Sequence, residues 1–250
     1  MERLTAAGPV LVHFLDFAQL NSVRSLPYVL AWAERYGDAG LRTIGVHSPR
    51  FPFSREPEAA AAGLGRLGVS HPVALDPELR HWRDYGCHGW PSLFLWGRGG
   101  GLRWYHLGEG EYEATELAVR EAVSEAEGGN GTDWPAPLEP IRPTDAPWAE
   151  VVVPSSELFP GGAPETPWRP ETTEDGLALE YEGGGAYASV DGAGTLSLVL
   201  DEKAPIALEV AAPGLVELAR HERHQGHSLE LRISDGELAI YSLSFAPGIP

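Results

Sequence analysis

The sequence is poor in cysteine, in positive charge and in long apolar runs. Cys87 is its single cysteine among 250 residues, so no intramolecular disulfide can form. Lysine and arginine total 18 against 36 acidic residues, for a formal net charge of −18, which argues against nucleic acid or anionic membranes as partners. No apolar run could span a bilayer and no leader pattern follows Met1, so we expect a cytoplasmic protein.

A strand–turn–helix pattern lies between Val10 and Pro27. The first five residues are apolar apart from His13, as in a buried strand, and apolar positions recur at helical spacing from Leu26. Between them stand residue types common in turns and helix caps: Asp16, Gln19, Asn21 and Ser22. We predict Ser22 as the helix N-cap. Helix N-termini stabilise negative charge, so chemistry is often sited there.

This stretch resembles the thioredoxin-like thiol–disulfide oxidoreductases, in particular the TlpA-like and DipZ-like branch of bacterial proteins. In that family the strand leads into Cys-x-x-Cys at the helix start, and a proline follows five residues later. Here Gln19 and Ser22 occupy the cysteine positions and Pro27 the proline position. His13 stands where the family usually has a buried acid or amide. The resemblance thus implies a redox frame without its sulfurs.

Strand and helix patterns alternate onward to residue 126. We predict strands at 41–46, 72–76, 93–96 and 102–107, and helices at 56–67, 77–85 and 112–126. This order is that of an α/β thioredoxin fold. Segments 45–53 and 108–112 are also similar to segments frequent in the DipZ-like branch.

The loop before strand 93–96 contains Trp90-Pro91, which matches the cis-proline position of the family. The resemblance implies a cis bond that faces the helix start and a loop that pairs with an extended substrate. A groove formed by His13, Asp16, Asn21, Trp90 and Pro91 could therefore bind a protein or peptide without any thiol.

Cys87 lies in the same loop, beside His88, and is the one candidate for a catalytic thiol. A neighbouring imidazole can lower the pKa of a thiol. Free cysteines are also among the most buried residues and often act only as small apolar side chains. Both interpretations stay open from the sequence.

The composition changes after residue 127. Ten prolines between 135 and 170, with tryptophans among them, predict an ordered, extended connector over 128–170. From 171 to 250 short alternating segments separated by turn residues predict an all-β antiparallel sandwich, jelly-roll-like. This part resembles the β-sandwich appended to DipZ-like thioredoxin domains. We therefore expect domains at 1–127 and 171–250.

Three histidines, His221, His224 and His227, form an HxxHxxH pattern between two of the predicted strands. Imidazoles can bind zinc or copper, but this spacing suits no common metal motif. We predict a polar hairpin loop there, with no metal and no cofactor.

Three functional hypotheses follow. The first is a thioredoxin-like protein that has lost dithiol chemistry and binds a protein or ligand. The second is a one-cysteine oxidoreductase or peroxidase that uses Cys87. The third is a site rebuilt without sulfur from His13, Asp16, Gln19 and Ser22, which burial of His13 would argue against.

Overall fold

A computed structural model describes residues 2–128, 134–172 and 175–250, and it divides into two compact units. The first unit comprises Met1–Pro49 and Ala60–Ile141, and the second comprises Arg50–Ala59 and Arg142–Pro250. The chain thus crosses from one unit to the other three times. Residues 129–133 of the predicted connector lie outside the described part of the chain.

The first unit has a thioredoxin-like architecture, as predicted. Its sheet has the order β3-β2-β1-β4-β5, in which β1, β2 and β3 are parallel and β4 and β5 antiparallel. The strands are β1 (Val10–Leu15), β2 (Arg42–His47), β3 (Val73–Leu75), β4 (Ser92–Trp96) and β5 (Leu102–Leu107). The helices up to residue 126 are α1 (Glu2–Thr5), α2 (Leu20–Gly37), α3 (Pro57–Arg66), α4 (Arg80–Asp84) and α5 (Tyr112–Ala126). Only α1 has no counterpart in the sequence prediction.

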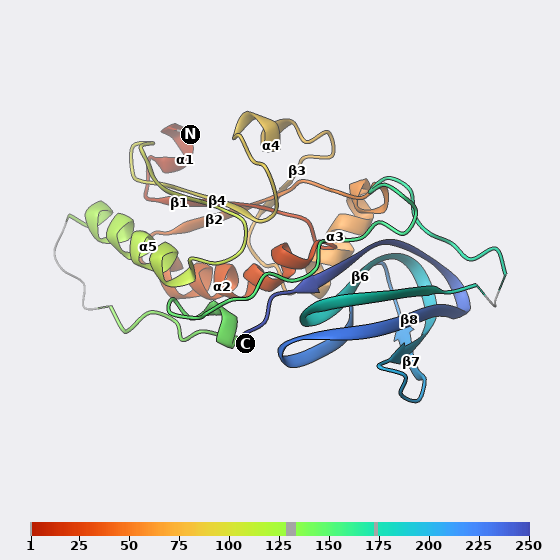
Figure 1. Ribbon diagram of the computed structural model, residues 1–250. Coiled ribbons are helices and arrows are strands. Elements are labelled where there is room, and N and C mark those ends of the chain that lie inside the picture. Colours follow the sequence, from red (N-terminus) through yellow and green to blue (C-terminus); the bar gives the residue numbers. More distant parts are fainter. Residues whose placement is uncertain (1, 129–133, 173–174) are drawn as a thin grey trace. The chain divides into compact units, whose positions relative to one another are not determined.

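Side chains that alternate along the central strands divide the core of the first unit into two layers. On one face Leu11, Leu93 and Leu95 pack against α2 and α5. On the other face Val12 and Phe94, among others, pack with Cys87 and with Trp82 of α4. Figure 1 shows α2 and α5 on one side of this sheet and α4 on the other.

A single buried carboxylate joins α2 to α5. Glu116 of α5 is 1% exposed and accepts hydrogen bonds from Trp32 Nε1 at 3.1 Å and Tyr36 Oη at 2.6 Å. Arg35 and Arg120 each place a guanidinium nitrogen 3.0 Å from the same carboxylate. Burial raises the pKa of Glu116, but these hydrogen bonds outweigh it and hold the pKa below its ordinary value. The charge is therefore fully paired in the interior.

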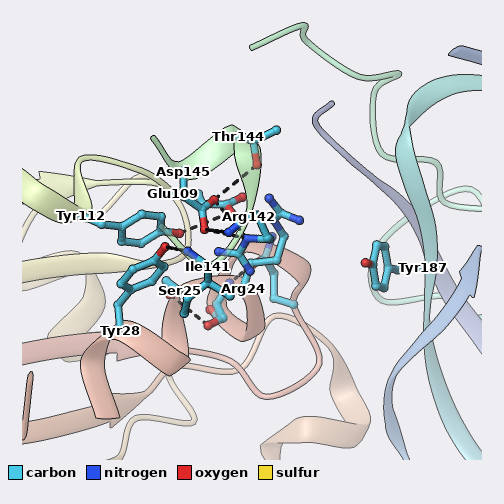
Figure 2. Close-up of polar contacts among 12 residues, drawn as sticks. Arg24, Ser25, Tyr28, Glu109, Tyr112, Ile141, Arg142, Thr144, Asp145 and Tyr187 are labelled. Carbon is cyan, nitrogen blue, oxygen red and sulfur yellow. Dashed lines mark hydrogen bonds and ion pairs between the residues drawn. The ribbon is translucent and has the colours of Figure 1, made fainter. Parts of the chain in front are cut away.

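The chain from 134 to 141 packs against the same two helices. Prolines leave this stretch few backbone donors, and two of those that remain meet side chains of the first unit. The Leu138 N–H donates to Glu116 at 2.9 Å, and the Ile141 N–H donates to the Tyr28 hydroxyl at 2.7 Å, which Figure 2 shows. This part of the predicted connector is ordered because side chains satisfy its backbone.

The second unit contains a separate three-stranded antiparallel sheet with the order β7-β6-β8, as predicted for its fold class. Its strands are β6 (Leu177–Leu200), β7 (Ile206–Val210) and β8 (Gly214–Ala246), and two short 3₁₀ helices, Pro52–Arg55 and Pro143–Asp145, also belong to it. The strands are much longer than predicted, because expected turns lie inside them as bends. Residues 185–190 pair with both 214–220 and 240–246, and one apolar cluster forms the core.

Glycines permit the close approach of β6 and β8. Gly192 has a φ of +91°, and a Cβ added there would clash with the carbonyl oxygen of Glu237. Only glycine adopts such a backbone without strain. Among the described residues no helix is long and apolar enough to cross a membrane.

Replacement of Glu116 by alanine should destabilise the protein by about 3 kcal/mol, because two partly buried guanidinium groups would lose their counterion. The measurement is urea denaturation followed by tryptophan fluorescence. Glu121→Ala removes an exposed carboxylate from the same helix and should change the free energy of unfolding by less than about 0.5 kcal/mol. Equal losses in the two variants would contradict the assigned role of Glu116.

Candidate functional site

The two positions that correspond to the cysteines of the redox motif are filled by hydrogen-bonding side chains. Gln19 is the N-cap of α2, and its Oε1 accepts the Ser22 N–H at 2.9 Å. The prediction that Ser22 is the N-cap is therefore wrong: Ser22 lies inside the helix, and its Oγ accepts the Asp16 N–H at 3.1 Å. Gln19 is 8% exposed and Ser22 1%. Both side chains support the turn that starts the helix.

Asp16 lies at the centre of the turn between β1 and α2 and is fully buried. Its Oδ1 accepts the Ala18 N–H at 3.0 Å and lies 3.6 Å from His47 Nε2. The Phe17 ring stacks on the His47 ring with 5.5 Å between centroids. The structure thus brings Asp16, Gln19 and Ser22 together as one hydrogen-bonded turn.

His13 does not join this network. It is fully buried in β1, between Gly45 of β2 and Leu93 of β4, and neither ring nitrogen has a hydrogen-bond partner among the described residues. Burial, with a smaller contribution from repulsion by His71, lowers the pKa of His13 to about 3. A neutral, enclosed imidazole argues against the hypothesis of a polar site rebuilt around His13.

The Trp90–Pro91 peptide bond is cis, which is the geometry predicted from the sequence. Pro91 is buried and Trp90 half-buried. The indole Nε1 of Trp90 donates to the carbonyl oxygen of Ser48 at 2.8 Å, and its ring stacks on Trp82 at 5.1 Å. Of the five predicted groove residues, only Trp90 and Asn21 are partly open to solvent.

Cys87 is 3% exposed, in the apolar layer beneath α4. Burial raises the pKa of its thiol, a contact with Ser92 opposes that change, and the charge of Asp76 adds to it. Asp76 is itself buried and accepts the N–H groups of His81 and Trp82. The thiol therefore lies in surroundings that favour its neutral form.

A turn near the start of α2 fixes a further charge there. Glu109 Oε1 lies 2.6 Å from Arg24 Nε, and the Tyr112 hydroxyl donates to the same carboxylate oxygen at 3.3 Å (Figure 2). Tyr112 in turn stacks on Tyr28 of α2 at 3.8 Å. The sequence marks Glu109 only as a turn residue, and nothing in its local pattern indicates that it pairs with α2.

In the second unit the prediction of a hairpin loop at the three histidines is wrong, since His221, His224 and His227 lie within β8. The strand continues because His227 pairs with Tyr181 of β6 and the His224 N–H donates to the Ile249 carbonyl. The His221 and His227 rings stack at 3.6 Å. In the described part of the chain no three His, Cys, Asp or Glu side chains are grouped to hold a metal ion.

The chain is similar to curated proteins over nearly its whole length. It is 29% identical to the protein DipZ of Mycobacterium bovis. The match covers 94% of this chain and 38% of the length of DipZ. It is also 30% identical to NHL repeat-containing protein 2 of Bos taurus over 46% of this chain and 16% of that protein. No family model matches. The resemblance to DipZ-like proteins that the motifs predict is confirmed.

Solved structures of thiol–disulfide proteins are similar to about half of the chain. A thiol-disulfide isomerase from Corynebacterium glutamicum matches with a TM-score of 0.46 and 20% identity over 50% of this chain and 86% of its own. A secreted disulfide oxidoreductase from Mycobacterium tuberculosis matches with a TM-score of 0.41 and 10% identity over 48% of this chain and 85% of its own. The thioredoxin-like fold is assigned from the strand order and directions rather than from these scores.

The buried His13 should make stability depend on pH. Unfolded histidine binds a proton near pH 6.5, whereas folded His13 does so only near pH 3, so the unfolded chain binds more protons between these values. Stability should therefore fall as the pH drops from 6.5 towards 3, and His13 contributes up to about 1.4 kcal/mol per pH unit. The free energy of unfolding, measured by urea denaturation at several pH values in this range, should depend less steeply on pH for His13→Leu than for the wild type.

Thr43→Val is the matched control for that measurement. Thr43 lies on β2 next to β1, is buried, and has a hydroxyl without a hydrogen-bond partner among the described residues. The substitution removes a polar atom from the same region without removing a titrating group. The free energy of unfolding of Thr43→Val should therefore depend on pH as steeply as that of the wild type. If the free energy of unfolding changed equally with pH in the wild type and in His13→Leu, the assigned role of His13 would be wrong.

Cys87 should react slowly with alkylating reagents while the protein is folded. Its burial and raised pKa predict a rate at pH 8 more than about tenfold below that of the chain in urea. The readout is mass spectrometry after timed iodoacetamide treatment, with Cys87→Ala as the blank. A fast folded-state rate with a midpoint below pH 7 would revive the one-cysteine enzyme hypothesis.

Proposed function

We propose that this chain is a thioredoxin-like binding module that does not exchange disulfides. Dithiol chemistry needs one thiolate to attack a disulfide and a second thiol to resolve the mixed disulfide. The observation that carries the proposal is the hydrogen bonding of Gln19 and Ser22, which turns both cysteine positions into parts of a helix cap. The chain keeps the fold of redox proteins, and two hydrogen-bonding side chains stand in place of the reactive cysteine pair.

The binding surface that we propose is the cis-proline loop with the start of α2. Trp90 offers a half-exposed indole that is anchored at one end by Ser48 and on one face by Trp82. Aromatic side chains held in this way contact a partner at low entropic cost. Asn21 supplies a half-exposed amide from the first turn of α2. The partner would be an extended segment of a protein or peptide, held without a covalent bond.

The one-cysteine enzyme is the weaker alternative. It needs an accessible thiolate, and the burial and raised pKa of Cys87 do not favour one. The chain spans only 38% of the length of DipZ, so a large part of that protein has no counterpart in it. The net charge of −18 also disfavours nucleic acid as the partner.

The loss of redox chemistry is tested by restoring the thiols. The wild type should not reduce insulin with dithiothreitol, and its rate should equal that of Cys87→Ala. In the Cys87→Ala background, Gln19→Cys with Ser22→Cys should form a disulfide, seen as a mass loss of about two hydrogens, and should gain reductase activity. Wild-type activity that disappears in Cys87→Ala would overturn the proposal in favour of the enzyme.

The binding part is tested with a displayed library of random peptides selected on the full chain. Selected peptides should bind Asn21→Trp at least about tenfold more weakly, because a bulky indole replaces a small amide on the proposed binding surface at the start of α2. Glu121→Trp, at an exposed position of α5, should leave binding unchanged. Selection of no peptide, or equal losses in the two variants, would contradict a groove at the cis-proline loop.

A further inference from the structure

Asp76 is a buried carboxylate whose hydrogen bonds lead to the proposed binding surface. It follows β3 directly and is 3% exposed. Its Oδ1 accepts the His81 N–H at 3.0 Å, and its Oδ2 accepts the Trp82 N–H at 2.9 Å and the Ser48 hydroxyl at 3.1 Å. Ser48 comes directly after β2, whereas His81 and Trp82 belong to α4. One carboxylate therefore links the end of β2 to the first turn of α4.

The helix α4 starts without a capping side chain of its own. Its N-cap residue is Leu79, whose side chain makes no capping hydrogen bond. The first N–H groups of a helix have no partner within it, and a cap oxygen usually accepts the one from the second or third residue. His81 and Trp82 are those two residues, and Asp76 accepts both of their N–H groups. The carboxylate thus replaces the cap and fixes the backbone of Trp82.

The two groups that hold the Trp90 side chain are both bonded to Asp76. The indole Nε1 of Trp90 donates to the Ser48 carbonyl oxygen at 2.8 Å, and Ser48 is fully buried and donates its hydroxyl to Asp76. The Trp90 ring stacks on Trp82 with 5.1 Å between centroids and 24° between planes. Each support of Trp90 is therefore one hydrogen bond away from the same carboxylate.

The two stacked indoles are the part of this arrangement that a partner can reach. Trp82 and Trp90 are both half-buried. Trp82 Nε1 is enclosed and Trp90 Nε1 is bonded to Ser48, so the two side chains contact a partner through ring carbons. Contact through rigid rings depends on their exact placement, which in binding sites is maintained by residues that do not touch the ligand.

We propose that Asp76 is the positioning residue of the binding surface: it sets the arrangement of Trp82 and Trp90 and does not itself contact the partner. The binding role rests on the proposed function, whereas the arrangement rests on the hydrogen bonds alone. Asp76→Asn keeps a carbonyl oxygen for the helix N–H groups and gains an N–H group that can donate to the Ser48 hydroxyl. Asp76→Ala keeps neither interaction, so the two variants separate the role.

The arrangement is tested by nuclear magnetic resonance of the indole N–H groups in the full chain, with Trp90→Phe to identify the Trp90 signal. In Asp76→Ala this signal should shift and its hydrogen exchange should become at least about tenfold faster, because the indole loses its fixed acceptor. Asp76→Asn should restore exchange to within about threefold of the wild type. If Asp76→Ala does not fold, Ser48→Ala removes only the link to the carboxylate and should speed exchange by about threefold or more.

Two controls separate positioning from general loss of stability. The Trp134 indole donates to Ser124 Oγ at 3.1 Å, outside this arrangement, and its signal should stay unchanged in Asp76→Ala. Glu78→Ala removes an exposed carboxylate two residues away and should leave the Trp90 signal as in the wild type. An unchanged Trp90 signal in Asp76→Ala, or an equal change at Trp134, would overturn the proposal.

The binding role is tested with the peptides selected on the full chain. They should bind Asp76→Ala at least about tenfold more weakly and Asp76→Asn less than about threefold more weakly, with Glu78→Ala equal to the wild type. Wild-type affinity in Asp76→Ala, or equal losses in Asp76→Ala and Glu78→Ala, would overturn the positioning role. Selection of no peptide contradicts the proposed function instead, and the Trp90 signal then decides alone whether Asp76 arranges the two indoles.

Discussion

The buried carboxylate of Glu116 is the interaction on which the first unit depends. A lone charge in the interior would cost several kcal/mol, but here two guanidinium groups, an indole, a phenol and a backbone N–H surround it. These donors come from α2, from α5 and from the chain after residue 134. The orientation of α2 is therefore fixed partly far from its N-terminus, by a hydrogen-bond network that includes neither motif position. That separation explains how the sulfurs can be absent while the frame stays intact.

At the N-terminus of α2 the backbone N–H groups of the first turn can stabilise a reactive group or donate to a structural cap. Unpaired N–H groups and the helix dipole stabilise a thiolate where a cysteine is present. In this chain the amide oxygen of Gln19 takes up one of those N–H groups, and the hydroxyl of Ser22 fixes the preceding turn. His13 takes part in neither bond and is enclosed without a hydrogen-bond partner among the described residues. Gln19 and Ser22 thus contribute to a set of local hydrogen bonds at the positions that hold cysteines in the redox motif.

The sequence is most informative where a residue's role follows from its neighbours along the chain. Apolar periodicity predicts the strands and helices of the first unit closely, and α5 has the predicted bounds, Tyr112–Ala126. Long-range roles are not predicted: Gln19 is not a preferred cap residue, and Glu116 reads as one acid on an amphipathic helix. The histidines in β8 are polar and spaced by three, which suggests a loop, yet pairing of the strand with β6 keeps them extended.

The three crossings of the chain between its units bear on how this molecule can be divided. Residues 50–59 belong to the second unit although they lie inside the first in sequence, and residues 134–141 belong to the first although composition places them with the connector. No single cut separates the two units with all of their residues. A fragment that ends at residue 127 would lack the backbone donors that complete the environments of Glu116 and Tyr28. Exchange of one unit between related proteins would therefore require at least three junctions, so the two units are expected to be inherited as a pair.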